Sequence, residues 1–147
     1  VTYMGSPYSC AFSGKALTFF SSRNLASPEL VEQRNIEERI DSVFYSDEYA
    51  AAIVRNTNGE YGSRLEVYKK DGTHVLSKEF NFEYTHADFD GDLIILYNED
   101  SCRIYNMSGT EKFDATFDFP VSKIRKGRFP GTLVVTGPQQ MQELKLR

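Results

Sequence analysis

The chain has no tryptophan and, among its 147 residues, only two cysteines and two histidines. Two cysteines are too few for a disulfide-stabilised scaffold, and no Cys-x-x-Cys or mixed His/Cys spacing predicts a metal site. The longest apolar runs reach about five residues, against the roughly 18 that cross a bilayer, and no signal peptide lies within the sequence. We therefore expect no disulfide framework and no direct membrane insertion by these residues.

An excess of positive charge is also lacking. The 17 Lys and Arg residues are outnumbered by 21 Asp and Glu residues, which gives a net charge of −4 at pH 7. Nucleic-acid-binding domains normally present a basic face, so no nucleic-acid partner is expected. One basic cluster stands at 123–128 ("KIRKGR"), and it indicates either a surface loop or an anion or phosphate patch.

The residues that are present describe a globular chain rich in strands. Hydrophobic residues make up 40% and charged residues 26%, which is typical of one folded domain. Aromatic residues reach 14%, all Phe or Tyr, and their enrichment favours β-structure. The sequence opens with Val rather than Met. We therefore expect its true N-terminus, and any targeting segment, to be missing.

An internal repeat gives the architecture. The stretch 67–80 ("VYKKDGTHVLSKEF") returns 37 residues later (109 − 72) as 104–117 ("IYNMSGTEKFDATF"). Each copy predicts a strand, a tight turn at a glycine that accepts positive φ, and a second strand. Cys102 falls where the earlier copy has Leu65, so we expect Cys102 to be buried and inert. A disulfide between Cys10 and Cys102 remains the alternative.

Four copies of this scheme follow one another at intervals of about 40 residues, which is typical of β-propeller blades. Short apolar runs at 17–20, 49–54, 93–97 and 132–135 predict buried first strands. Phe12, Phe44, Phe89 and Phe129 mark the same corner in each copy. The predicted organisation is one propeller-like domain. Its approximate blades are 1–40, 41–84, 85–121 and 122–147, and the last blade lacks its fourth strand.

The two ends of this scheme leave alternatives open. Ser27 and Pro28 resemble the start of a helix, so residues after 26 predict a short helix or an irregular insertion, whereas Leu30 and Val31 also suit an outer strand. Residues 1–4 predict a strand that completes the last blade or ends a blade upstream. The chain is then a four-bladed ring, part of a larger ring, or half of a ring closed by a second copy.

The expected fold is therefore all-β, made of propeller-type repeats of four-stranded antiparallel blades, as a partial, C-terminal propeller. A β-sandwich or barrel is the alternative. The segment 98–113 ("NEDSCRIYNMSGTEKF") resembles PQQ-type and WD40-type propeller repeats. Phe113 and Leu76 stand where the PQQ-type motif has tryptophan, and the Trp-Asp dipeptide is absent as well. The resemblance therefore implies a fold and carries no cofactor site.

The segment 90–109 ("DGDLIILYNEDSCRIYNMSG") also resembles the bacterial family known as domain of unknown function 5711. Members of that family resemble membrane-anchored propellers whose propeller lies outside the membrane. The resemblance implies an extracytoplasmic location and anchoring through a segment that this sequence lacks. It implies no known activity.

The sharpest candidate for chemistry is "DFDGD", with Asp88, Asp90 and Asp92. Alternating carboxylates around a glycine are possible Ca²⁺ ligands, yet Gly91 comes one residue too early for an EF-hand loop. A repeat turn explains the same residues without metal. His86 lies just before them in a predicted loop, and His86 with Asp88 or Asp90 is the one acid–base candidate. No catalytic or cofactor-binding residue is predicted.

Three classes of function follow from these patterns. The first is a non-catalytic binding or scaffolding propeller domain of a larger surface-anchored protein, with a protein, cell-surface or glycan partner. The second is an enzyme that uses loop residues near His86. The third is an assembly domain that closes a ring by homo-oligomerisation. Surface aromatic residues would serve the first class, and the candidates are Tyr3, Tyr8, Tyr45, Tyr61 and Tyr84.

Overall fold

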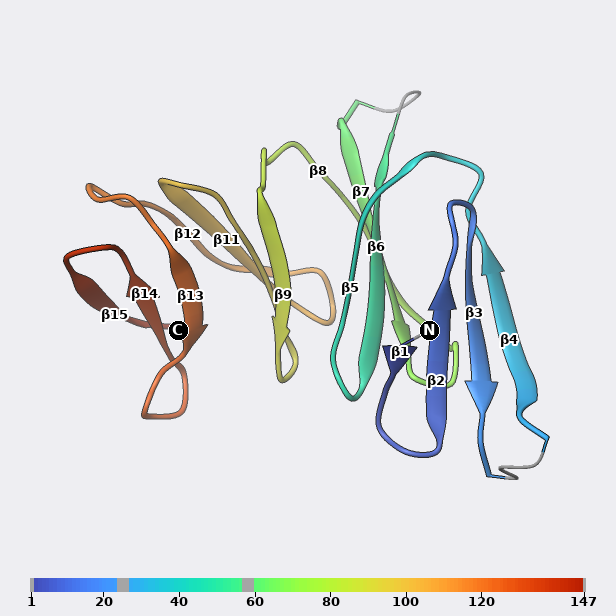
Figure 1. Ribbon diagram of the computed structural model, residues 1–147. Coiled ribbons are helices and arrows are strands. Elements are labelled where there is room, and N and C mark those ends of the chain that lie inside the picture. Colours follow the sequence, from blue (N-terminus) through green and yellow to red (C-terminus); the bar gives the residue numbers. More distant parts are fainter. Residues whose placement is uncertain (1, 24–26, 57–59, 147) are drawn as a thin grey trace. The chain divides into compact units, whose positions relative to one another are not determined.

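The structure, a computed structural model, describes residues 2–23, 27–56 and 60–146. Within these ranges it contains fifteen strands, arranged in four antiparallel sheets, and no helix (Figure 1). The all-β prediction is confirmed, and the sheets are antiparallel as predicted. The described residues include no helical segment with the length and apolarity needed to span a membrane.

Sheets A and B are formed by the first eight strands, and each sheet keeps its strands in chain order. Sheet A consists of β1 (Thr2–Tyr3), β2 (Tyr8–Phe12), β3 (Ala16–Ser21) and β4 (Glu29–Asn35). Sheet B consists of β5 (Ile40–Tyr45), β6 (Tyr49–Arg55), β7 (Ser63–Lys69) and β8 (His74–Phe80).

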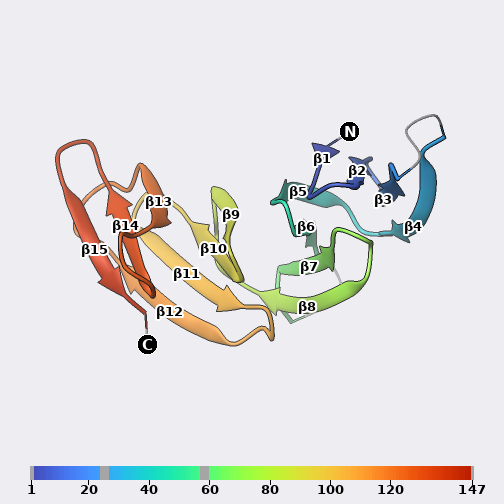
Figure 2. The ribbon, with the colours of Figure 1, turned by 90° about the horizontal axis from the view of Figure 1, so that it is seen from below.

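Sheets C and D follow the same plan. Sheet C consists of β9 (His86–Asp90), β10 (Leu93–Tyr97), β11 (Ser101–Asn106) and β12 (Glu111–Thr116). Sheet D has three strands among the described residues, namely β13 (Lys123–Lys126), β14 (Thr132–Thr136) and β15 (Met141–Lys145). Figure 2 shows how successive hairpins build each sheet strand by strand.

The chain divides into two compact units. Unit 1 covers 1–81 and contains sheets A and B, whereas unit 2 covers 82–147 and contains sheets C and D. In unit 1 the two sheets share an apolar core in which Leu17 and Phe19 of sheet A meet Ala52 and Tyr68 of sheet B. The Phe19 and Tyr68 rings lie 6.0 Å apart.

The core of unit 2 joins sheets C and D in the same way. Ile95 and Ile104 of sheet C pack with Ile124, Leu133 and Val135 of sheet D, and all five side chains are buried. The segment between the sheets is held by two backbone bonds, in which the amides of Phe117 and Val121 donate to the carbonyls of Asp100 and Glu99. Each unit is therefore a pair of sheets with its own core.

The repeat is visible in the backbone itself. The third and fourth strands of sheets A, B and C pair with a register shift at the same place, after Phe19, Val67 and Ile104. The turns that close the repeated hairpins carry Gly72 and Gly109 at φ +88° and +84°, as predicted from their spacing. A bulge strengthens the local twist of a strand pair, so the equivalent irregularity strengthens the twist of each of the three hairpins at the same place.

The order of strands within the repeat differs from the prediction. The apolar runs at 49–54, 93–97 and 132–135 form second strands, and the first strands are β5, β9 and β13. These first strands are short, and polar residues interrupt their apolar ones. They therefore contain no apolar run that would predict a strand from the sequence. Phe12 also breaks the predicted pattern, because it ends a second strand, whereas Phe44 and Phe89 lie in first strands.

The predicted helix or insertion after residue 26 is wrong. Residues 29–35 form strand β4, which pairs with β3 from Ala16↔Asn35 to Ser21↔Glu29. The Ser-Pro pair lies just before the strand, and pairing along β3 satisfies the backbone groups that a helix would have satisfied internally. Thr2 and Tyr3 form the first strand of sheet A, paired with β2, rather than a strand of the last sheet.

Both cysteines are free and buried. Cys102 is fully covered on β11, as its match with Leu65 predicted. Burial raises the pKa of each thiol to about 12. Neither cysteine therefore carries a reactive thiolate at neutral pH.

Candidate functional site

The predicted residues of the "DFDGD" region lie on the first strand of sheet C. His86, Asp88 and Asp90 alternate along β9, so their side chains share one face of the sheet. The His86 ring stacks on Tyr97 at 4.8 Å and 8° between planes, and its Nδ1 lies 2.9 Å from the Thr85 hydroxyl. The described contacts of the His86 ring therefore fix its orientation through an aromatic neighbour and a hydroxyl.

The three aspartates occupy different environments. One Asp88 oxygen accepts the Phe89 amide at 2.8 Å, whereas Asp92 lies beyond Gly91, whose φ of +57° closes the β9–β10 hairpin. The hairpin turn thus accounts for Gly91, and a contact with the neighbouring backbone amide accounts for one oxygen of Asp88. Among residues 2–23, 27–56 and 60–146, no three His, Cys, Asp or Glu side chains are placed to hold a metal ion. A Ca²⁺ site at Asp88, Asp90 and Asp92 stays a prediction.

Asp90 is the perturbed member of this row. Partial burial raises the pKa of its carboxyl, and Asp88 raises it further, while Lys126 acts in the opposite direction. One of its oxygens, Oδ2, is buried and has no hydrogen-bond partner among the described residues. An ionised carboxylate without a partner destabilises the folded state.

Asp90→Asn is expected to stabilise the protein at neutral pH by about 1 kcal/mol, because it removes this buried charge. A raised pKa of the Asp90 carboxyl means that the folded state binds the proton more tightly than the unfolded state does. The ionised carboxylate therefore lowers the free energy of unfolding, and this loss is fully present above the pKa of the folded state. The gain should vanish as the pH falls below the ordinary value of 3.8. Urea denaturation of both proteins at several pH values measures it, and a gain independent of pH would contradict the assignment.

A polar network that the sequence did not predict centres on Glu66 of β7. Its carboxylate accepts bonds from Arg64 at 2.8 Å and from Ser77 at 2.5 Å, and it lies 2.8 Å from Nε2 of His74. Arg64 also forms a two-pronged pair with Glu38, at 2.8 and 3.0 Å. These hydrogen bonds lower the pKa of Glu38 and raise that of Arg64.

The chemistry of this network is structural. A serine nucleophile needs the histidine between itself and the carboxylate, so that the imidazole takes the serine proton. Here the carboxylate of Glu66 stands between His74 and Ser77, and both side chains bind the same acid. The network therefore ties the third and fourth strands of sheet B together and includes no such proton relay.

The equivalent position of sheet C carries the opposite charge. Arg103 lies 37 residues after Glu66, and its Nε lies 3.9 Å from both Glu111 and Asp114 of β12. Its guanidinium also stands over the Phe82 ring at 5.1 Å. Comparing charges across the two repeat copies would have located both clusters from the sequence.

A pocket of about 270 Å³ opens in unit 1, where turns of sheets A and B meet. Backbone bonds fix these turns, because the Gly5 amide donates to the Asp47 carbonyl at 2.6 Å and the Lys70 amide to the Glu48 carbonyl at 2.9 Å. The pocket is lined by Tyr8, Glu48, Tyr49, Lys69, Lys70 and Asp71.

The pocket presents aromatic rings beside charges of both signs. The Lys70 ammonium lies 5.8 Å from the centre of the Tyr8 ring and 3.4 Å from Glu48. Lysine is therefore held between a π face and a carboxylate, at the point where the two sheets meet. The sequence predicts Tyr8 as a surface aromatic residue, but nothing in the sequence brings Lys70 and Glu48 to it.

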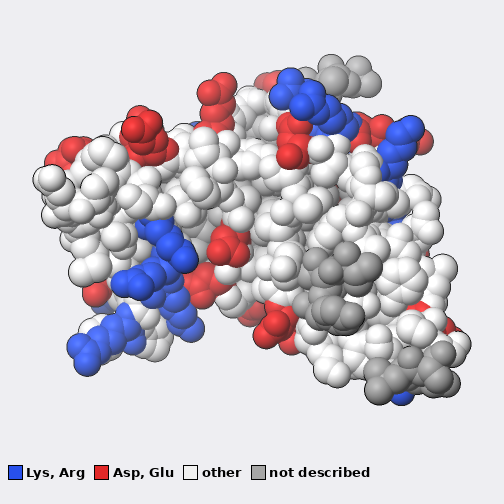
Figure 3. Space-filling view, in the orientation of Figure 1, with Lys and Arg blue, Asp and Glu red and all other residues white. Residues whose placement is uncertain are grey.

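The basic cluster at 123–128 is a strand and its following turn rather than a loop alone. Lys123, Arg125 and Lys126 lie on β13 and Arg128 in the next turn, and all four side chains are exposed. Figure 3 shows Lys and Arg side chains gathered over this part of unit 2.

At the end of unit 2 that carries its β14–β15 turn, a recess of about 440 Å³ is lined by Phe119, Pro120, Pro138, Gln139 and Gln140.

The solved structures with a similar fold include propellers and a designed protein, at identities that indicate the fold alone, and the predicted propeller-type fold is confirmed. Hsv2p from Kluyveromyces lactis matches all of this chain with a TM-score of 0.58 and 9% identity, and the match covers 45% of Hsv2p. A crystallised part of HIRA matches 92% of the chain with a TM-score of 0.58 and 11% identity, and 45% of its own length. Both are WD40-type propellers, and the chain spans about half the length of each.

A third similar structure is a computationally designed protein, Ika4. It matches 94% of this chain and 89% of its own, with a TM-score of 0.54 and 9% identity. Among curated proteins, none matches the sequence significantly. The sequence model of a family of unknown function, DUF5711, matches residues 1–146.

Proposed function

The chain belongs to the DUF5711 family, whose function is unknown, and we propose that it is a non-catalytic binding and scaffolding domain. The domain is part of a larger, surface-anchored bacterial protein. It recognises a protein or cell-surface partner through the ends of its sheets. The match to about half of the Hsv2p and HIRA chains supports a propeller-type scaffold within a larger protein.

The pocket between sheets A and B is the observation that carries this proposal. Its lining residues come from the ends of strands β2, β6 and β7 and from the turns beside them, which backbone hydrogen bonds fix, so a partner meets a preformed surface. Preformed surfaces lose little conformational entropy on binding. Tyrosine supplies contact area with few rotatable bonds, and the paired charges of Lys70 and Glu48 give directionality.

The test is a selection from a displayed peptide library on the wild-type chain, with counter-selection on the double variant Tyr8→Ala/Lys70→Ala. Selected peptides are expected to bind the wild type with micromolar dissociation constants and the double variant about tenfold more weakly, because interface energy concentrates in a few anchors. Fluorescence anisotropy measures both. The matched control is Tyr61→Ala/Lys112→Ala, which removes the same two side chain types at exposed positions elsewhere. Peptides that bind all three proteins equally would overturn the role of the pocket.

A further inference from the structure

The outward face of sheet D carries a mixed charged and apolar surface. Pairing across the sheet sets Arg125 beside Val134 and Val134 beside Glu143, in a row that faces away from the core residues Ile124, Leu133 and Leu144. A second row on the same side contains Lys123, Thr136 and Met141. We call this surface the outer D face, and it consists of Lys123, Arg125, Val134, Thr136, Met141, Glu143 and Lys145.

The repeat shows that this face is unlike its counterparts. On the third strands of sheets B and C, the corresponding positions hold Leu65 with Val67 and Cys102 with Ile104, and all four side chains are fully buried. The third strand of sheet D has Met141 and Glu143 instead, and both are exposed. A glutamate covered by another apolar sheet would lose its hydration without a partner. The outer D face is therefore suited to a polar contact.

The charges of the outer D face are uncompensated. It holds three cations, Lys123, Arg125 and Lys145, against the single anion Glu143. Across residues 120–147 the sequence has six basic residues and one acidic residue. Arginines of unit 1, such as Arg39, Arg55 and Arg64, pair with carboxylates, whereas none of the four cations at 123–128 makes an ion pair with a described residue. A surface of this kind attracts an acidic partner.

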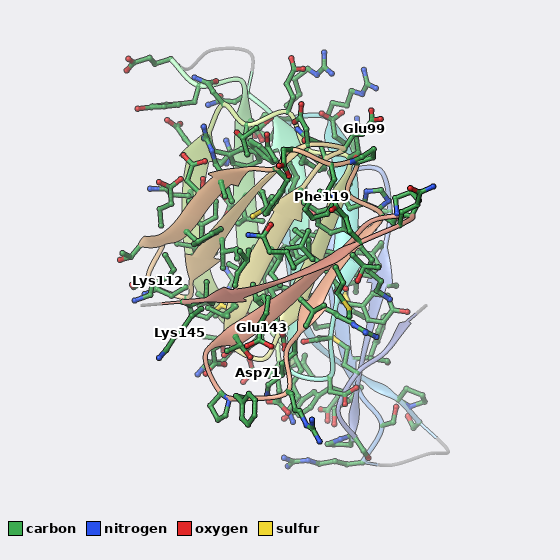
Figure 4. The ribbon with its side chains drawn as sticks, turned by 90° about the vertical axis from the view of Figure 1, so that its left-hand side faces the viewer. Asp71, Glu99, Lys112, Phe119, Glu143 and Lys145 are labelled. Atoms are coloured by element: carbon green, nitrogen blue, oxygen red, sulfur yellow. The ribbon has the colours of Figure 1, made fainter. Side chains whose placement is uncertain are left out.

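An apolar centre distinguishes this surface from a simple anion site. Met141 is 66% exposed, and Val134 lies beside Arg125 in the middle strand. Methionine and arginine are enriched in protein interfaces, and methionine adapts to differently shaped side chains. Figure 4 looks onto this side of unit 2 and shows Glu143 and Lys145 on β15.

We propose that the outer D face binds an acidic polypeptide segment that places an apolar side chain against Met141 and Val134 and carboxylates beside Lys123 and Arg125. This proposal goes beyond the binding function proposed above, because it concerns a different surface in the other unit. It stands or falls independently of the pocket between sheets A and B.

The probe is a short fluorescein-labelled peptide of Asp and Glu residues around a central Leu-Phe pair. It is expected to bind the wild-type chain and to bind Lys123→Glu/Arg125→Glu at least about tenfold more weakly. The control is Lys15→Glu/Lys112→Glu, which changes the net charge equally at two exposed positions outside the outer D face. Circular dichroism confirms that each variant remains folded.

A second variant is expected to bind the acidic peptide more tightly than the wild type does, and misfolding would not produce such a gain. Glu143→Gln removes the one carboxylate of the outer D face and is expected to tighten binding of the acidic peptide about threefold. Met141→Ala is expected to weaken the acidic peptide but to leave inorganic polyphosphate unaffected, since polyphosphate has no apolar group.

Four results would overturn the proposal. The first is no binding of the acidic peptide, and the second is equal weakening by both charge-reversal pairs. The third is unchanged or weaker binding to Glu143→Gln. The fourth is stronger binding of polyphosphate or of anionic phospholipid vesicles than of the peptide, which would identify a general polyanion surface. Loss of peptide binding in Tyr8→Ala/Lys70→Ala would instead place the peptide at the pocket.

Discussion

Replacing Phe19 by alanine is expected to lower the free energy of unfolding by about 3–5 kcal/mol, the largest effect of any substitution described here. The Phe19 ring is fully buried in the core of unit 1, where it meets the Tyr68 ring and touches the turn at Gly72. Alanine leaves a cavity between two sheets whose strands are fixed by their own hydrogen bonds, so the walls cannot collapse into it. Because the chain lacks tryptophan, urea denaturation followed by circular dichroism is the suitable measurement.

Two further substitutions serve as references for the stability that Phe19→Ala is expected to lose. Phe19→Leu keeps most of the buried area and is expected to cost less than half as much as alanine. Phe129→Ala removes the same side chain from a site where it is 60% exposed, and its effect should stay within about 0.5 kcal/mol. Equal effects of Phe19→Ala and Phe129→Ala would mean that Phe19 does not hold the two sheets of unit 1 together.

Gly72→Ala is expected to destabilise the protein by about 2–4 kcal/mol, because two costs add at this position. Its φ of +88° is unfavourable for any residue with a side chain. An added Cβ would also lie 2.5 Å from the Cβ of Glu32 on sheet A. The Gly72 carbonyl accepts the Arg34 Nε at 2.9 Å, so a shift of the turn breaks a contact between the sheets.

Gly91→Ala separates the two costs. Gly91 also has positive φ, at +57°, but an added Cβ would have open space around it. Its substitution should cost about 1 kcal/mol, the conformational part alone. The difference between the two variants in urea denaturation measures the close approach of sheets A and B at Gly72. A difference near zero would show that the turn can move without loss.

The sequence predicts the parts of this fold that are encoded locally. A turn glycine between two alternating strands is such a signal, and the hairpins around Gly72 and Gly109 were found from it. The first strands β5, β9 and β13 are not detected because only one residue of each is buried. For the residues of β4 the sequence favours a helix or insertion over a strand, because the Ser-Pro pair before them is a local helix signal that pairing with β3 overrides.

The candidate sites also differ in whether their residues are neighbours in the sequence. The row of His86, Asp88 and Asp90 could be placed together because its members are neighbours in sequence. The pocket lined by Tyr8 and Lys70 needs strand ends and turns from two sheets, and the outer D face needs the register of β13, β14 and β15. Such sets become visible only when strand pairing is known. That Lys123 and Arg125 have no ion-pair partner among the described residues is also visible only in the structure.

The opposite charges of Glu66 and Arg103 have a consequence for how the chain folds. The two hairpins are so alike that β7 can in principle pair with β12, and β11 with β8, in the same register and around similar turns. Pairing β7 with β12 would set Glu66 against Asp114, two carboxylates, whereas the native partner there is Ser77. Like charges opposite each other weaken strand pairing. The opposite charges of Glu66 and Arg103 therefore favour native over exchanged pairing between β7 and β12.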